Sequence, residues 1–132
     1  MLAMNLSYLV IYVPDVPAAL SFYESAFGLR RRFLHESQQF GELDTGTTAL
    51  AFTSHALAAD AVPLRYRPLR PADEAAGFEL TLTTDDVAAA FDHAVAAGAS
   101  GVAVPQETPW GQTVAYVRDH VGTAVGLATP MA

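Results

Sequence analysis

Hydrophobic and polar positions alternate in the same way in two stretches of the chain. Tyr8-Leu-Val-Ile-Tyr-Val-Pro-Asp15-Val16 and Glu79-Leu-Thr-Leu-Thr-Thr-Asp-Asp86-Val87 match in register, 71 residues apart (86 − 15 = 79 − 8 = 71). The period of two predicts a strand at residues 6–13 and a second strand that contains Glu79. In the first strand, one face holds Leu9, Ile11 and Val13 and the other holds Tyr8, Val10 and Tyr12. We expect the aliphatic face to pack on helices.

Helical spacing of hydrophobic residues follows each of these strands. It predicts a helix over residues 16–27, with Asp15 as its N-cap and Gly28 at its end. In the second copy, Asp85 or Asp86 caps a helix that Gly98 ends. Three shorter strands are expected after each helix, at residues 30–35, 39–44, 47–54, 100–104, 112–118 and 123–128.

The order βαβββ therefore occurs twice, which predicts an α+β fold made of two tandem modules. We expect the first module at residues 1–60 and the second at 77–132, within one structural domain. Residues 61–76 contain three prolines and three arginines, and this composition is typical of an extended linker.

Composition narrows the function. The chain has 132 residues, 52% of them hydrophobic, and no hydrophobic run long enough to span a bilayer, so we expect a cytoplasmic globular protein without a membrane partner. The net charge of −7 argues against nucleic acid as a partner, because phosphates are bound by clustered positive charge. The absence of cysteine excludes disulfides and thiolate chemistry. All seven basic residues are arginines, which excludes Schiff-base lysines.

The doubled motif resembles the vicinal oxygen chelate superfamily, which includes glyoxalase I, extradiol dioxygenases and bleomycin-resistance proteins. The resemblance rests on Val-Pro-Asp15-Val, Phe22-Tyr23-Glu-Ser-Ala-Phe-Gly28-Leu, Pro109-Trp-Gly and Arg118-Asp119-His-Val-Gly122. It implies a curved mixed sheet around a central cavity, with the helices on the outer face. It also implies a homodimer, since relatives commonly pair modules across two chains.

In the relatives that use a metal, ligands lie on the first and last strands of each module. By resemblance these positions are Tyr8, Ala51, Glu79 and Gly126. Of these four, only Glu79 is a strong ligand for a divalent metal, and metal catalysis needs about three protein ligands. We therefore expect no metal and no cofactor, with a weakly bound divalent ion at Glu79 as the open alternative.

Six residues are candidates for binding a small molecule: Tyr8, Tyr12, Ala51, Glu79, Trp110 and Gly126. Glu79 is either a catalytic base or counter-charge in the site, or a carboxylate that pairs with an arginine or faces solvent. The tyrosines either stack on and hydrogen-bond a ligand or fill the cavity, and Trp110 forms either one wall of the pocket or a lid over the core. None of the four histidines occupies a ligand position, and His55 is the one to check first.

The leading hypothesis is a metal-independent small-molecule binding protein of the glyoxalase/bleomycin-resistance type, with an aromatic or cationic ligand. One alternative is a glyoxalase- or dioxygenase-related enzyme with a degenerate metal site. Another is a non-catalytic subunit or regulatory domain. Whether the chain is an enzyme stays open at this point.

Overall fold

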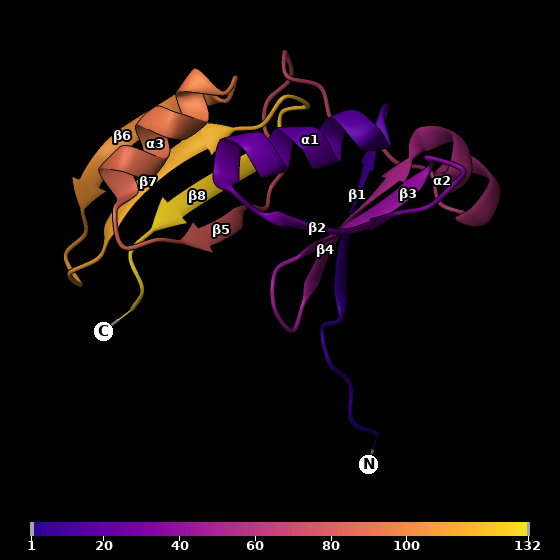
Figure 1. Cartoon of the computed structure of the whole chain (residues 1–132), viewed down its shortest axis with the longest axis horizontal. Helices are drawn as coiled ribbons and strands as arrows, with labels where there is room; N and C mark the ends of the chain where they lie inside the picture. The colour runs from indigo at the N-terminus through magenta and orange to yellow at the C-terminus, as the bar shows by residue number, and fades with distance from the viewer. Residues whose placement is uncertain (1, 132) are drawn as a thin grey trace. The chain divides into compact units, whose positions relative to one another are not determined.

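The computed structural model describes residues 2–131 and divides the chain into two compact units. Unit 1 comprises residues 1–24 and 28–68, and unit 2 comprises residues 25–27 and 69–132. Each unit contains a four-stranded mixed sheet and repeats the order strand, helix, strand, strand, strand (Figure 1). The predicted α+β fold of two tandem βαβββ modules is confirmed.

The sheet of unit 1 has the strand order β1-β4-β3-β2. Its strands are β1 (Tyr8–Val13), β2 (Arg30–Leu34), β3 (Phe40–Asp44) and β4 (Ala49–Ser54). Helix α1 (Val16–Phe27) follows β1, and its last three residues are assigned to unit 2. β1 pairs with β4 in parallel, while the other neighbours are antiparallel. β1 therefore lies at one edge of this sheet, with β4 as its neighbour.

The predicted ends of α1 are confirmed. The Asp15 side chain accepts a hydrogen bond from the amide of Ala18 at 3.0 Å, so it satisfies one of the amides that the first turn leaves unpaired. Gly28 ends the helix with a φ of 67°, in the left-handed region that glycine adopts without steric cost. The core of unit 1 lies between this helix and the sheet, where Leu20, Tyr23 and Phe52 are fully buried.

A further helix, α2 (His55–Ala61), follows β4 directly and was not predicted. The Ser54 side chain caps it by accepting a hydrogen bond from the amide of Leu57 at 3.0 Å. Four of its seven residues are alanine, which has the highest helix propensity, so the segment is helical although it lacks a long periodic pattern.

The sheet of unit 2 has the strand order β5-β8-β7-β6 and repeats the pairing of unit 1. Its elements are β5 (Leu80–Thr83), α3 (Val87–Ala96), β6 (Ser100–Glu107), β7 (Thr113–Arg118) and β8 (Ala124–Ala128). Figure 1 shows α3 lying along this sheet. Of the two candidate caps, Asp86 is the one that accepts a hydrogen bond, from the amide of Ala89 at 3.0 Å.

Candidate functional site

α1 covers one face of the unit 1 sheet, and the opposite face presents the candidate residues of this unit. A Cβ atom at Gly41 would lie 2.7 Å from Leu20 and 3.4 Å from Val16, so Gly41 faces the helix. Side chains alternate along a strand, and Glu42 therefore points to the other side of the sheet. We call this side the α1-distal face. Tyr8, Val10 and Tyr12 also lie on it, because β1 and β3 are registered through β4.

The middle of the α1-distal face is a row of four residues, one from each strand. Register places Val10 beside Ala51, Ala51 beside Glu42, and Glu42 beside Phe33. Val10 and Phe33 are 41% and 39% exposed, whereas Ala51 is fully buried. The row thus combines exposed hydrophobic side chains at its ends with a small residue in its middle.

Aromatic rings gather at one end of this face. Tyr12 and Tyr66 have ring centroids 4.8 Å apart, and His55 stacks on Tyr66 at 5.7 Å. Nδ1 of His55 also lies 2.7 Å from the hydroxyl of Tyr66. His55, which the sequence singled out, therefore positions Tyr66 from the segment that was predicted to be a linker.

Tyr8 lies one row away from Ala51. It is registered with Ala49, and Val10 takes the place directly beside Ala51. More than half of the Tyr8 side chain is exposed, so it is not a filler of the core of unit 1. Its part in ligand binding stays a prediction.

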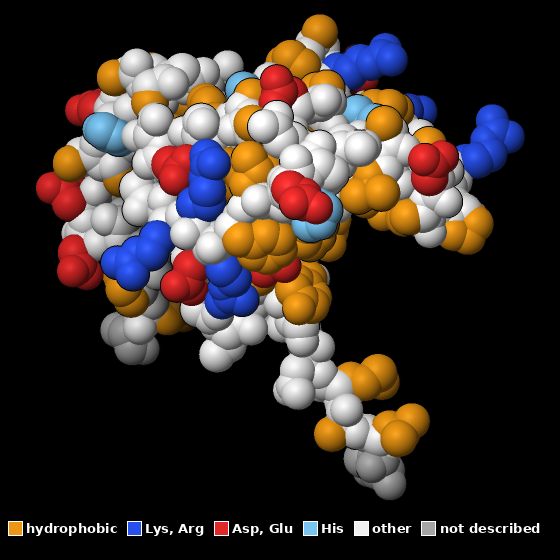
Figure 2. Space-filling model, turned by 45° about the vertical axis from the view of Figure 1, so that its right-hand side comes forward, with side chains coloured by type: hydrophobic (Ala, Val, Ile, Leu, Met, Phe, Trp, Pro, Cys, Tyr) orange, Lys and Arg blue, Asp and Glu red, His pale blue; other side chains and the backbone are white. Residues whose placement is uncertain are grey.

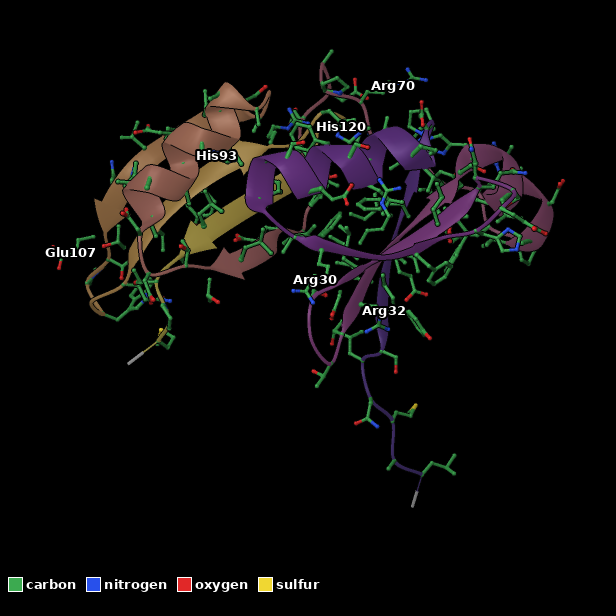
Figure 3. The ribbon with its side chains drawn as sticks, viewed as in Figure 1. Arg30, Arg32, Arg70, His93, Glu107 and His120 are labelled. Carbon is green, nitrogen blue, oxygen red and sulfur yellow. The ribbon has the colours of Figure 1, made fainter. Side chains whose placement is uncertain are left out.

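Sequence reasoning missed Glu42, the acidic residue of the central row. Glu42 is only 6% exposed, and its Oε1 lies 3.6 Å from Nη1 of Arg32. Arg32 is shared with Asp44, whose Oδ1 lies 3.7 Å from Nη2. Figure 3 shows Arg30 and Arg32 on the side of the sheet away from α1. The alternation of Phe40, Glu42 and Asp44 in the predicted strand 39–44 would have placed Glu42 on this face.

Glu79 of unit 2 lies just before β5, and the expectation that it lies within the strand is wrong. It is exposed, and its Oε2 accepts a hydrogen bond from the hydroxyl of Thr81 at 2.7 Å. A Cβ atom at Gly126 would lie 2.5 Å from the same Oε2. The structure thus brings Glu79 and Gly126 together, because glycine leaves room for the carboxylate on β8.

Trp110 lies in the turn before β7 and is mostly exposed. Its indole Nε1 donates a hydrogen bond to Oε1 of Gln112 at 2.7 Å, and the side-chain Nε2 of Gln112 in turn donates to the carbonyl of Thr129 at 2.7 Å. The indole is therefore anchored to its own turn. A role in ligand binding stays a prediction for this residue.

Comparison with known families decides the wider relationship. Residues 5–127 match the sequence model of the Glyoxalase/Bleomycin resistance protein/Dioxygenase superfamily. The chain belongs to this superfamily. The resemblance inferred from the doubled motif is thereby confirmed, since the matched range covers both modules.

Solved structures of other proteins share the fold. A glyoxalase-related enzyme from Fulvimarina pelagi has a TM-score of 0.82 and 18% identity, over 97% of this chain and 89% of that one. A glyoxalase/bleomycin resistance protein/dioxygenase family enzyme from Burkholderia phytofirmans PsJN has a TM-score of 0.75 and 24% identity, over 96% and 98%. TioX from Micromonospora sp. ML1 has a TM-score of 0.71 and 20% identity, over 96% and 98%. At these identities the likeness shows the fold alone.

No curated protein matches the chain. None of the helices within residues 2–131 has the length and hydrophobicity needed to cross a membrane.

The residues at the four superfamily ligand positions do not fit a divalent metal. Ala51 and Gly126 offer no side-chain donor, and Tyr8 offers a phenol, which leaves Glu79 as the one carboxylate of the set. The Glu79 carboxylate already accepts a hydrogen bond from Thr81. In the described part of the chain, residues 2–131, no three His, Cys, Asp or Glu side chains are grouped so that they could hold an ion.

Proposed function

We propose that this superfamily member binds a small aromatic molecule on the α1-distal face of unit 1, without a metal ion. The observation that supports the proposal is the central row, in which the exposed hydrophobic side chains of Val10 and Phe33 stand at the two ends and Ala51 and Glu42 lie between them. Binding sites for small molecules combine hydrophobic and aromatic walls with a few polar groups. Tyr12 and Tyr66 supply aromatic surface next to this row, and Glu42 supplies a polar group within it.

Ala51 is fully buried, so neighbouring side chains cover this small residue in the middle of the face. In metal-using relatives its position holds a ligand side chain, by the resemblance described above, whereas alanine ends at Cβ. A truncated side chain in the middle of a sheet leaves volume that a neighbouring group or a ligand fills. In unit 2 the corresponding position is Gly126, where the carboxylate of Glu79 occupies the space that a Cβ atom would take.

The enzyme alternative depends on Glu79 as a base, and its surroundings do not favour it. A general base is usually tuned by burial or by neighbouring charges. Glu79 is exposed and accepts a hydrogen bond from Thr81. We therefore place binding, rather than catalysis, first.

We also propose that the chain acts as a cytoplasmic homodimer. Leu2, Met4 and Leu6 are strongly exposed hydrophobic residues, and they share the parity of Tyr8 and Val10 in β1. Figure 1 shows this N-terminal segment extending away from the unit 1 sheet, and Figure 2 shows hydrophobic side chains along it. An edge strand with a hydrophobic face is a template for pairing with a second chain.

A titration with 2-phenylethanol, followed by the amide NMR signals of Val10 and Ala51, tests the binding proposal. We expect these two signals to shift with ligand concentration. Val10→Asn should weaken binding by about 5-fold, because it removes roughly 1 kcal/mol of hydrophobic contact.

Val104 is the matched control for this experiment, because it is an exposed valine on β6 in unit 2. Val104→Asn should leave the affinity for 2-phenylethanol unchanged. Equal weakening by the two substitutions, or no shift of the Val10 and Ala51 signals in the parent protein, would contradict the proposed site.

A further inference from the structure

The carboxylate of Glu42 is the most buried charged group of the α1-distal face. Glu42 is 6% exposed, although it lies on the side of the sheet that α1 does not cover. A buried carboxylate needs a positive charge or hydrogen-bond donors to replace the water that it has lost. Within residues 2–131, Arg32 supplies its ion pair.

In residues 2–131 the Glu42 oxygens are not among the buried polar atoms that have no partner, and the ion pair with Arg32 is long. Nη1 of Arg32 is 3.6 Å from Oε1 of Glu42, which is longer than the 2.7–2.9 Å of a charge-assisted hydrogen bond. A carboxylate has about four acceptor sites on its two oxygens. Arg32 also forms an ion pair with Asp44, in which Nη2 of Arg32 lies 3.7 Å from Oδ1 of Asp44, and the Arg32 side chain is 47% exposed. It is a loosely held counter-ion that a better donor can replace.

The neighbours of Glu42 define which donor fits. Register places Glu42 between Ala51 and Phe33 in the central row, and Phe33 packs on Phe40 with ring centroids 5.6 Å apart. Phe40 is also on this face, since it alternates with Glu42 along β3. An acidic group bordered by aromatic rings favours an organic cation, which gains both an ion pair and contact with the rings. The net charge of −7 favours the same sign of ligand.

We propose that Glu42 binds the ammonium group of an aromatic amine ligand, and that Arg32 swings away toward Asp44 when the ligand enters. The proposal rests on the proposed function, because it names the ligand class of the same face. The position that the resemblance assigns to a metal ligand at the end of this module is Ala51, on β4. The acidic group of this unit lies one strand over, on β3, where register holds it beside Ala51.

Phenethylamine and 2-phenylethanol test the proposal, because they have the same ring and chain length and differ in charge at pH 7. We expect the wild-type protein to bind the amine about 10-fold more tightly than the alcohol, because only the amine forms an ion pair with Glu42. Glu42→Gln should reduce the affinity for phenethylamine to that for 2-phenylethanol. The affinity of this variant for 2-phenylethanol should stay within about 2-fold of the wild-type value. The measurement is the NMR titration of the amide signals of Val10 and Ala51.

Glu107→Gln is the matched control, because Glu107 is an exposed glutamate on β6 of unit 2 (Figure 3). It should leave both affinities unchanged. Arg32→Met gives a second and independent variant that keeps Glu42. It should tighten amine binding by about 3-fold, because the competing counter-ion is gone. If Glu42→Gln fails to fold, weaker amine binding by Arg32→Met overturns the proposal.

The outcomes separate this inference from the proposed function. Equal affinities of wild-type protein for the amine and the alcohol overturn the role of Glu42 but leave the binding face in place. Tighter binding of phenylacetate than of phenethylamine also overturns it, since the arginines would then select an anion. No binding of any of the three probes overturns the proposed function, and the role of Glu42 with it.

Discussion

Gly122 and Gly126 lie four residues apart, but a methyl group at each would meet different neighbours. At Gly122, φ is 99°, and a Cβ atom would lie 2.7 Å from the backbone carbonyl oxygen of Arg70. At Gly126, the closest atom is Oε2 of Glu79, the far end of an exposed side chain. Backbone cannot easily move aside, whereas an exposed carboxylate can.

We therefore expect Gly122→Ala to lower the free energy of unfolding by about 2 kcal/mol or more. Gly126→Ala should cost less than about 1 kcal/mol, because Glu79 turns away into solvent. Urea unfolding of both variants measures the difference. Equal losses would show that the space beside Glu79 is as constrained as the turn at Gly122.

The alternation of side chains along a strand, which we call strand parity, made some of the site residues predictable from the sequence but not others. Applied to β1, it placed Tyr8, Val10 and Tyr12 on one face, which the register with β4 confirms. It was not applied to the third strand of the module, so Glu42 was missed. The contact between Glu79 and Gly126 depends on a side-chain rotamer and on space over β8, and neither is visible in a one-dimensional pattern.

Among the elements, the helices and strands with a clear period were predicted, and the short helix α2 was not. α1 and α3 have aspartate caps and hydrophobic residues at helical spacing, so their ends were found to within a few residues. α2 has seven residues, and its only strong signals are alanine content and Ser54 as a cap. A helix this short is stabilised mainly by tertiary packing, and Ala58 is the residue of α2 that is buried.

β1 is the element on which the proposed dimer depends. Leu6 precedes this edge strand and is 72% exposed. A carboxylate at this position should weaken dimer formation, because two like charges repel each other and a charge buried at the interface loses its hydration. The fold of the single chain should not change. We expect Leu6→Glu to convert a dimer into a monomer in light scattering.

Leu64→Glu is the control for this change, because Leu64 is an exposed leucine of unit 1 outside the strands. It should remain dimeric. A monomeric wild-type protein, or a Leu6→Glu variant that stays dimeric, would contradict the proposed use of the β1 edge.

At the scale of the whole molecule, the chain has the duplicated scaffold of its superfamily, and of the four positions that the resemblance assigns to metal ligands only Glu79 carries a carboxylate. Both units repeat the same strand order, and the chain matches the superfamily over residues 5–127. Scaffold depends on hydrophobic patterning, which many sequences satisfy, while metal binding depends on three or four individual side chains. The fold was therefore predictable from the sequence, whereas the chemistry of the site was not.

The most direct test of the account is the affinity for phenethylamine before and after dialysis against EDTA, on protein purified without a chelator. Metal content is measured on the same samples. We predict the same dissociation constant in both states, because Glu42 and the aromatic side chains of unit 1 bind the ligand without an ion. A stoichiometric transition metal whose removal abolishes binding, and whose return restores it, would contradict the central claim.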